Sequence, residues 1–137
     1  MSARSKARKR ALDILFSADL RQLPVAESLA AEAARAQNEP DRENSWLYAR
    51  DIVDGVIEHG PQIDETITGV ARGWSLERMP AVDRAILRAA VWELLYNDEV
   101  PAGVVISEAV ELASSLSTDD SGTFVNGVLS SIAKSQS

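Results

Sequence analysis

The sequence has 137 residues, no cysteine, a single histidine (His59) and a net charge of −7. This length fits one domain, and the lack of cysteine excludes disulfide bonds and thiolate metal sites. One histidine argues against most zinc and Ser-His-Asp chemistry, so we expect no metal, no cofactor and no enzyme. No apolar run approaches the roughly 18 residues of a membrane span.

The positive charge is concentrated at the N-terminus. Residues 1–10, MSARSKARKR, carry +5, which leaves −12 on residues 11–137. A basic arm on an acidic body favours a local contact with nucleic acid, although a merely solubilising N-terminus has the same composition. Asp13 and Asp19 interrupt the apolar stretch that follows the arm, unlike a secretory signal, so we expect a cytoplasmic protein.

Helical periodicity runs through almost the whole chain, and the alternation typical of strands is nowhere sustained. The predicted helices cover residues 5–22, 25–36, about 46–60, 61–72, 81–97, 102–116 and 119–134. Proline and glycine mark several of the boundaries, and the polar segment 37–44 reads as an exposed loop. The sequence therefore predicts an all-α fold of about seven helices in a single domain, 1–137. The breaks at 73–80 are a possible seam between two subdomains.

The second half of the chain carries several ordered motifs of a known family. They are Arg78-Met79-Pro80-Ala81-Val82-Asp83-Arg84-Ala85-Ile86-Leu87-Arg88, Val100-Pro101, Ile106-Ser107-Glu108-Ala109 and Phe124-Val125-Asn126-Gly127-Val128-Leu129. The opening Ala7-Arg8-Lys9-Arg10-Ala11-Leu12 fits the same family. With these residues the sequence resembles the transcription antitermination factor NusB over about residues 4–132, most weakly at 23–45.

The resemblance implies two three-helix subdomains plus one further helix. It also implies binding of boxA-like single-stranded RNA together with NusE, a small-subunit ribosomal protein, within the antitermination complex of RNA polymerase, notably on ribosomal RNA operons. Some ribosomal RNA methyltransferases carry a similar N-terminal domain, but they need a further catalytic domain, for which 137 residues leave no room. The state in solution, monomer or homodimer, stays open.

The candidate RNA-binding residues lie at the two ends of the chain. Cations contact RNA phosphates and aromatic rings stack on bases. From the arm and the first helix we take Arg4, Lys6, Arg8, Lys9, Arg10 and Phe16. Phe16 could equally be ordinary core.

In the last helix, Phe124 and Asn126 are RNA candidates by resemblance, with an apolar anchor as the alternative for Phe124. Asp120 lies by resemblance in the RNA-facing loop, where an acid would lower affinity, but Asp119 and Asp120 are first of all expected to cap the helix. We expect Gly127 to mark close helix packing.

A charged run in the central region gives candidates for protein docking. Glu77, Arg84 and Arg88 can reach neighbouring elements, either as a structural charge face or, by resemblance, on the side where NusE docks. Trp46, Trp74 and Trp92 are expected in the core or at an interface. The alternative for the whole protein is a helical protein–protein adaptor that does not bind RNA.

Overall fold

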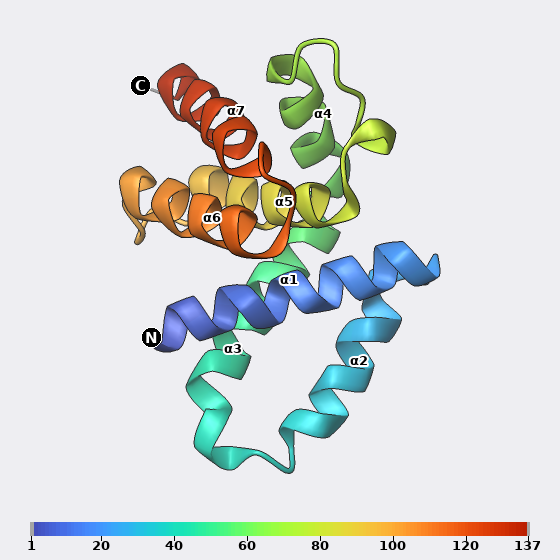
Figure 1. Ribbon diagram of the computed structural model, residues 1–137. Helices are drawn as coiled ribbons and strands as arrows, with labels where there is room; N and C mark the ends of the chain where they lie inside the picture. Colours follow the sequence, from blue (N-terminus) through green and yellow to red (C-terminus); the bar gives the residue numbers. More distant parts are fainter. Residues whose placement is uncertain (1, 137) are drawn as a thin grey trace.

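The computed structural model describes residues 2–136 and consists of α-helices joined by short links (Figure 1). The elements are α1 (Ala3–Arg21), α2 (Val25–Ala36), the 3-10 segment η1 (Pro40–Arg42), α3 (Glu43–Glu58), α4 (Gly60–Val70), the 3-10 segment η2 (Leu76–Arg78), α5 (Ala81–Tyr96), α6 (Ala102–Leu116) and α7 (Ser121–Ser135). No strand occurs within residues 2–136, and the all-α prediction is confirmed. Met1, the first residue of the predicted arm, lies outside the described residues.

Proline sets the start of several helices. Pro24, Pro80 and Pro101 each stand immediately before a helix, where the missing N–H costs no intrahelical hydrogen bond. The predicted loop at 37–44 is partly ordered, because it contains η1 and the start of α3. The last helix begins at Ser121, two residues later than predicted.

The helices form two groups around α5. In the first group α1 packs against α2 and α3, and in the second α5 packs against α6 and α7 (Figure 1). The remaining helix, α4, packs mainly on α5 and α7, while α1 joins the groups by also packing on α5. This agrees with two three-helix subdomains plus one helix. That residues 73–80 separate the subdomains remains a prediction.

The core follows the apolar faces of the helices, with α5 at its centre. Ile86, Leu87 and Val91 of α5 are almost completely buried, as the nearly continuous apolar sequence of this helix predicts. No helix within residues 2–136 combines the length and the apolar character that crossing a lipid bilayer requires.

Two glycines allow helices to approach closely, and neither is the one predicted. A Cβ added to Gly55 of α3 would lie 1.8 Å from Nε1 of Trp92, and one added to Gly122 would lie 2.5 Å from Oγ of Ser114. A Cβ at Gly127 would meet nothing within 4 Å. The predicted close packing at Gly127 is therefore wrong, because that residue lies on an exposed face of α7.

Candidate nucleic-acid interface

The basic arm is part of an ordered helix. Ser2 caps α1, since its Oγ accepts a hydrogen bond of 3.1 Å from the N–H of Ser5. All five cations predicted to bind RNA from the arm therefore lie in the first half of α1, at fixed angular positions. They do not share one face.

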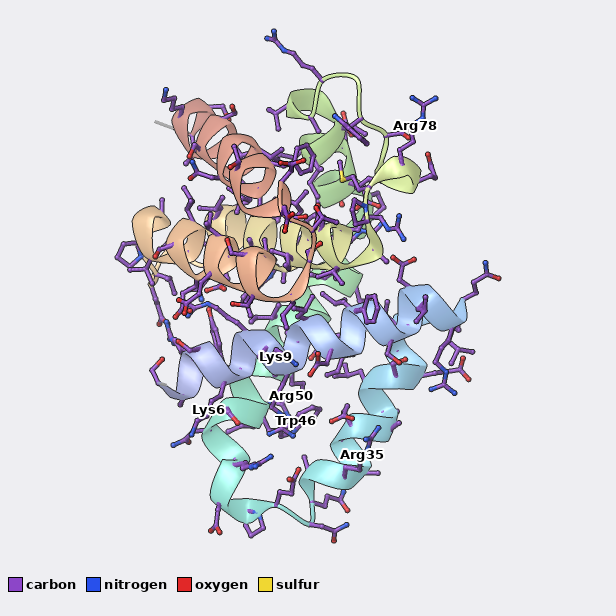
Figure 2. All side chains as sticks on the ribbon, viewed as in Figure 1. Lys6, Lys9, Arg35, Trp46, Arg50 and Arg78 are labelled. Carbon is purple, nitrogen blue, oxygen red and sulfur yellow. The ribbon has the colours of Figure 1, made fainter. Side chains whose placement is uncertain are left out.

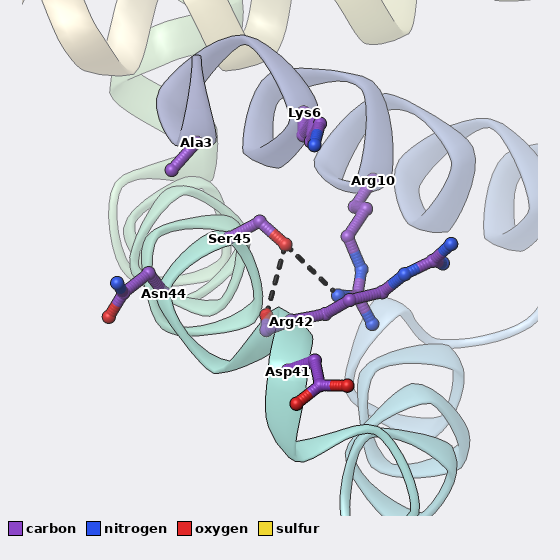
Figure 3. A pocket seen from close by; sticks show the side chains of 7 residues that line it. All are labelled: Ala3, Lys6, Arg10, Asp41, Arg42, Asn44 and Ser45. Carbon is purple, nitrogen blue, oxygen red and sulfur yellow. Dashed lines mark hydrogen bonds between the residues drawn. The ribbon is translucent and has the colours of Figure 1, made fainter. Parts of the chain in front are cut away.

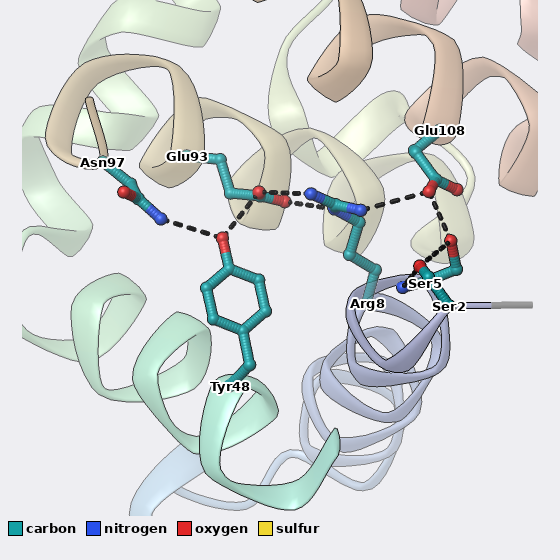
Figure 4. Close-up of polar contacts among 7 residues, drawn as sticks. All are labelled: Ser2, Ser5, Arg8, Tyr48, Glu93, Asn97 and Glu108. Carbon is teal, nitrogen blue, oxygen red and sulfur yellow. Dashed lines mark hydrogen bonds and ion pairs between the residues drawn. The ribbon is translucent and has the colours of Figure 1, made fainter. Parts of the chain in front are cut away.

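Arg8 points into the protein and joins α1 to α5 and α6 (Figure 4). Its Nε and one terminal nitrogen donate to the two carboxylate oxygens of Glu93 at 2.7 and 2.9 Å, and its other terminal nitrogen donates to Glu108 at 3.1 Å. Ser5 Oγ also donates to Glu108. Arg8 is only 6% exposed. The predicted contact between Arg8 and RNA is thus not favoured by its geometry, because the guanidinium is engaged in a buried ion pair.

Tyr48 of α3 completes this cluster. Its hydroxyl donates to Glu93 at 2.7 Å and accepts from the side-chain amide of Asn97 at 2.9 Å (Figure 4). Burial raises the pKa of Tyr48, and the hydrogen bond to Glu93 and its negative charge raise it further. Tyr48 therefore remains a neutral hydrogen-bond donor at physiological pH.

The partners of Arg8 also keep its guanidinium protonated. Burial alone would lower the pKa of Arg8, but the hydrogen bond and charge of Glu93, together with the charge of Glu108, raise it overall. Arg4 lies outside the pair, with its guanidinium carbon 4.5 Å from the centre of the Tyr48 ring and a terminal nitrogen 3.1 Å from Glu99. Sequence reasoning identified Arg8 but missed Glu93 and Tyr48 as its partners.

Of the other arm cations, Lys6 and Lys9 reach the surface (Figure 2). Lys9 forms an exposed ion pair with Asp13, with Nζ 2.8 Å from a carboxylate oxygen. Lys6 makes no ion pair and no side-chain hydrogen bond within residues 2–136. Arg10 donates to Ser45 Oγ at 3.2 Å, and its guanidinium carbon lies 5.6 Å from the centre of the Trp46 ring. Lys6 and Lys9 are therefore the arm cations most open to an anion, whereas the Arg10 side chain is only 16% exposed and enclosed by its partners.

A cavity of about 420 Å³ opens beside two of these cations, between α1, η1 and the first turn of α3 (Figure 3). Its lining residues are Ala3, Lys6, Arg10, Asp41, Arg42, Asn44 and Ser45. Three of the seven are basic. Arg42 and Asn44 could not be identified from the sequence, because they lie in the segment where the family resemblance is weakest.

A second cavity, of about 270 Å³, lies at the start of α7. Its lining residues are Trp74, Met79, Pro80, Asp83, Thr118, Asp120, Ser121 and Phe124. The rings of Trp74 and Phe124 meet edge to face, with centroids 6.1 Å apart. Phe124 is partly buried, whereas Trp74 is 50% exposed, so Trp74 does not lie in the core, and its alternative place at an interface remains a prediction. The position of Trp74 in the Gly73-Trp74-Ser75 break between two predicted helices could have indicated that its side chain is exposed.

Asp83 holds the loop that precedes α7. Its buried carboxylate accepts from Ser117 Oγ at 2.5 Å and from Ser121 Oγ at 2.9 Å. The N–H of Thr118 in turn donates to Ser121 Oγ at 3.1 Å. Asp120 is the N-cap residue of α7, but its side chain makes no capping hydrogen bond. The predicted capping by aspartate is therefore wrong, and Ser121 with Asp83 orders this turn instead.

The remaining RNA candidates lie apart from the arm cations. Asn126 is exposed on α7 and accepts a long hydrogen bond of 3.4 Å from Ser130. Phe16 is partly buried, packs on the core and makes no ring contact in the described part of the chain. Asp120 and Phe124 share the second cavity. RNA binding by all of these residues remains a prediction.

The three residues predicted to dock a protein partner differ in whether their side chains are already paired within the protein. Arg84 donates to Asp19 at 2.8 Å and to the backbone oxygens of Leu76 and Met79, and Arg88 forms a two-pronged pair with Asp64 at 2.9 and 3.1 Å. Both arginines thus tie α5 to neighbouring elements. Glu77 is exposed and has no ion pair within residues 2–136.

Comparison with known proteins gives one consistent result. The NusB family matches residues 5–134. The chain is 68% identical to the transcription antitermination protein NusB of Leifsonia xyli subsp. xyli (strain CTCB07), over 99% of this chain and 94% of that protein. It is 59% identical to the protein of the same name from Clavibacter sepedonicus, over 99% of both.

Solved structures agree with this result. T. maritima NusB superposes with a TM-score of 0.83 at 32% identity, covering 98% of this chain and 92% of that one. A structure of the antitermination factors NusB and NusE in complex with dsRNA superposes with a TM-score of 0.82 at 31% identity, covering 98% of each chain.

Proposed function

This chain belongs to the NusB family, and from that membership we propose that it is a transcription antitermination factor that binds boxA-like single-stranded RNA together with NusE. The observation that carries the proposal is the 68% identity to a transcription antitermination protein over 99% of the chain. A related structure that contains NusE and dsRNA supports NusE and RNA as partners, and the single-stranded form is taken from the family resemblance. The protein acts in this proposal as a non-enzymatic, cytoplasmic adaptor for the antitermination complex of RNA polymerase.

The geometry of α1 supports two roles for the cations of the basic arm, contact with RNA and attachment of α1 to the rest of the fold. Lys6, Lys9 and Arg4 present charge at the surface, whereas Arg10 is largely enclosed between Ser45, Glu39 and Trp46. Arg8 positions this surface by fixing α1 to α5 through Glu93. Phosphate contacts from such cations set the register of the RNA, and base contacts provide the specificity.

Bases are read in this proposal at the second cavity. Phe124 offers a ring for stacking there, and Phe16 and Asn126, which lie outside the cavity lining, are proposed as further contacts. Asp120 adds negative charge at the same cavity and so lowers the affinity for RNA. The acidic body of the protein limits the affinity in the same way, so we expect modest RNA affinity for the protein alone and a higher affinity with NusE.

NusE is proposed to dock on the side formed by η2 and α5. Of the three candidate residues, Glu77 is free to contact a partner directly. Arg84 and Arg88 act indirectly, because their pairs with Asp19 and Asp64 fix the position of α5.

The test is fluorescence anisotropy of a labelled boxA-like RNA, with and without NusE, over a salt series. Neutralising about three phosphates of a single strand predicts a slope of log affinity against log salt of about −2. The double variant Lys6→Gln, Lys9→Gln should weaken binding, while Lys134→Gln, the loss of an exposed lysine at the far end of the chain, should not. Deleting the whole arm is a poorer test, because Ala7 and Arg8 are part of the folded interior.

Binding of NusE without any binding of RNA, in either condition, would sink the proposal. The protein would then be a helical protein–protein adaptor with the same fold.

A further inference from the structure

The cavity between α1, η1 and α3 gathers positive charge on a protein whose net charge is −7. Lys6 and Arg10 enter it from α1, and Arg42 enters it from the end of η1 (Figure 3). These three cations come from segments more than 30 residues apart in sequence, so only the fold brings them together.

Arg10 is held in place before any ligand arrives. Its guanidinium donates to Ser45 Oγ at 3.2 Å, lies 3.6 Å from Glu39 and stands over the ring of Trp46. The Arg10 side chain is only 16% exposed. A guanidinium fixed in this way loses little conformational entropy when it binds an anion.

The positive charge of the cavity is only partly neutralised. Arg42 and Arg10 both pair with the carboxylate of Glu39, with nitrogen–oxygen distances of 3.4 Å for Arg42 and 3.6 Å for Arg10. Lys6 has no ion pair within residues 2–136. Asp41 also lines the cavity. Two carboxylates, of Glu39 and Asp41, thus stand against three cations, which leaves an excess of positive charge.

The first turn of α3 adds to this excess. Asn44 and Ser45 belong to that turn and line the cavity. Arg42 is the N-cap residue of α3, and its side chain makes no capping hydrogen bond. The positive end of the α3 dipole therefore lies at this edge of the cavity, where Glu43 of the same turn offsets part of it.

We propose that this cavity binds a phosphate group of the RNA backbone through Lys6, Arg10 and Arg42. This inference rests on the proposed function and extends it, since it carries the RNA contact from α1 to the segment between α2 and α3. Arginine forks match the paired oxygens of a phosphodiester, and a lysine adds a movable point charge. The site fixes the position of the RNA without reading its sequence.

The discriminating variant is Arg42→Gln. The Arg42 side chain is 69% exposed, so its loss leaves the folded interior intact, which circular dichroism checks. With NusE present at about 0.15 M salt, we expect Arg42→Gln to bind RNA about fourfold more weakly, with a salt slope shallower by about 0.7. Lys134→Gln removes one positive charge from an exposed side chain far from the cavity and should change neither quantity.

A second measurement locates the contact on the RNA. Methylphosphonate linkages, which carry no charge, are introduced one at a time along the boxA-like strand. One linkage should weaken binding to the unmodified protein more than it weakens binding to Arg42→Gln, because in the variant only Lys6 and Arg10 still contact that phosphate. If no linkage behaves in this way, or if Arg42→Gln matches Lys134→Gln while the unmodified protein binds RNA, the cavity is not an RNA site and only this inference fails.

Two further outcomes would overturn this inference for different reasons. If the unmodified protein fails to bind RNA with NusE, the proposed function fails and this inference with it. If inorganic phosphate shifts the amide NMR signals of Asn44 and Ser45 while Arg42→Gln leaves RNA binding unchanged, the cavity takes free phosphate, and the assignment to RNA is overturned.

Discussion

Arg8 of α1 and Glu93 of α5 form a two-pronged ion pair, at 2.7 and 2.9 Å, between side chains that are 7% and 2% exposed. The pair lies in the interior, where taking two charges out of water is costly and only good geometry offsets the cost. Tyr48 and Glu108 satisfy remaining hydrogen-bonding groups of the pair. A residue that looks like part of an RNA-binding arm therefore attaches that arm to the rest of the fold.

Removing the charge of Glu93 should be strongly destabilising. Glu93→Gln keeps the shape of the side chain but leaves the Arg8 guanidinium without its main counter-charge, and we expect a loss of about 3 kcal/mol in the free energy of unfolding. Urea denaturation measures this loss. Glu99→Gln removes the acid of the exposed pair with Arg4 and should cost under about 1 kcal/mol. Equal losses in the two variants would show that burial of the pair has no energetic consequence.

Tyr48 should make stability fall at alkaline pH. Its pKa is raised in the folded protein, so the unfolded chain loses the phenolic proton near its ordinary pKa of about 10 while the folded protein keeps it. Because the unfolded state then binds fewer protons, the free energy of unfolding decreases as pH rises above about 10. Urea titrations between pH 8 and 11 should show this decrease, and Tyr48→Phe should reduce it. An unchanged pH dependence in Tyr48→Phe would contradict the assignment.

The helices could be predicted from the sequence because their signals are local. Apolar spacing gave the number and the order of the helices, and Pro24, Pro80 and Pro101 placed three starts within one residue. The turn before α7 was predicted less well. Several Ser, Thr and Asp residues there could cap a helix, and the choice of Ser121 depends on Asp83, which is 38 residues away.

The candidate site was harder to predict for the same reason. The composition of the arm suggested five equivalent cations. Arg8 differs because it pairs with Glu93 in the interior, and this pairing could not be predicted since the two residues are 85 positions apart in sequence. The cavity beside Lys6 depends on Arg42, from a segment with no recognisable motif. Sequence alone identified residue types suited to RNA, and the packing of α1 on α3 and α5 decides which of them face outward.

Ser121 should contribute to stability through Asp83. Ser121→Ala removes a 2.9 Å hydrogen bond to a buried carboxylate, and we expect a cost of about 2 kcal/mol in the free energy of unfolding. Ser131→Ala is a matched control, since Ser131 is exposed on the same helix and makes no side-chain hydrogen bond in the described region. Thermal or urea unfolding of both variants gives the comparison. A loss below about 0.5 kcal/mol for Ser121→Ala would mean that water replaces the hydroxyl without cost.

Phe124 should be needed for RNA affinity more than for folding. Phe124→Leu keeps a large apolar side chain against the core but removes the ring face, and stacking of one base on an aromatic ring contributes about 1–3 kcal/mol. We therefore expect RNA affinity in the presence of NusE to fall at least about fivefold, with a salt slope unchanged because no charge is lost. Anisotropy over a salt series separates this effect from the effect of the cation variants, which change the slope. Unchanged affinity in Phe124→Leu would make Phe124 an apolar anchor of α7, and the base-reading surface would then have to be sought along α1, beginning with Phe16.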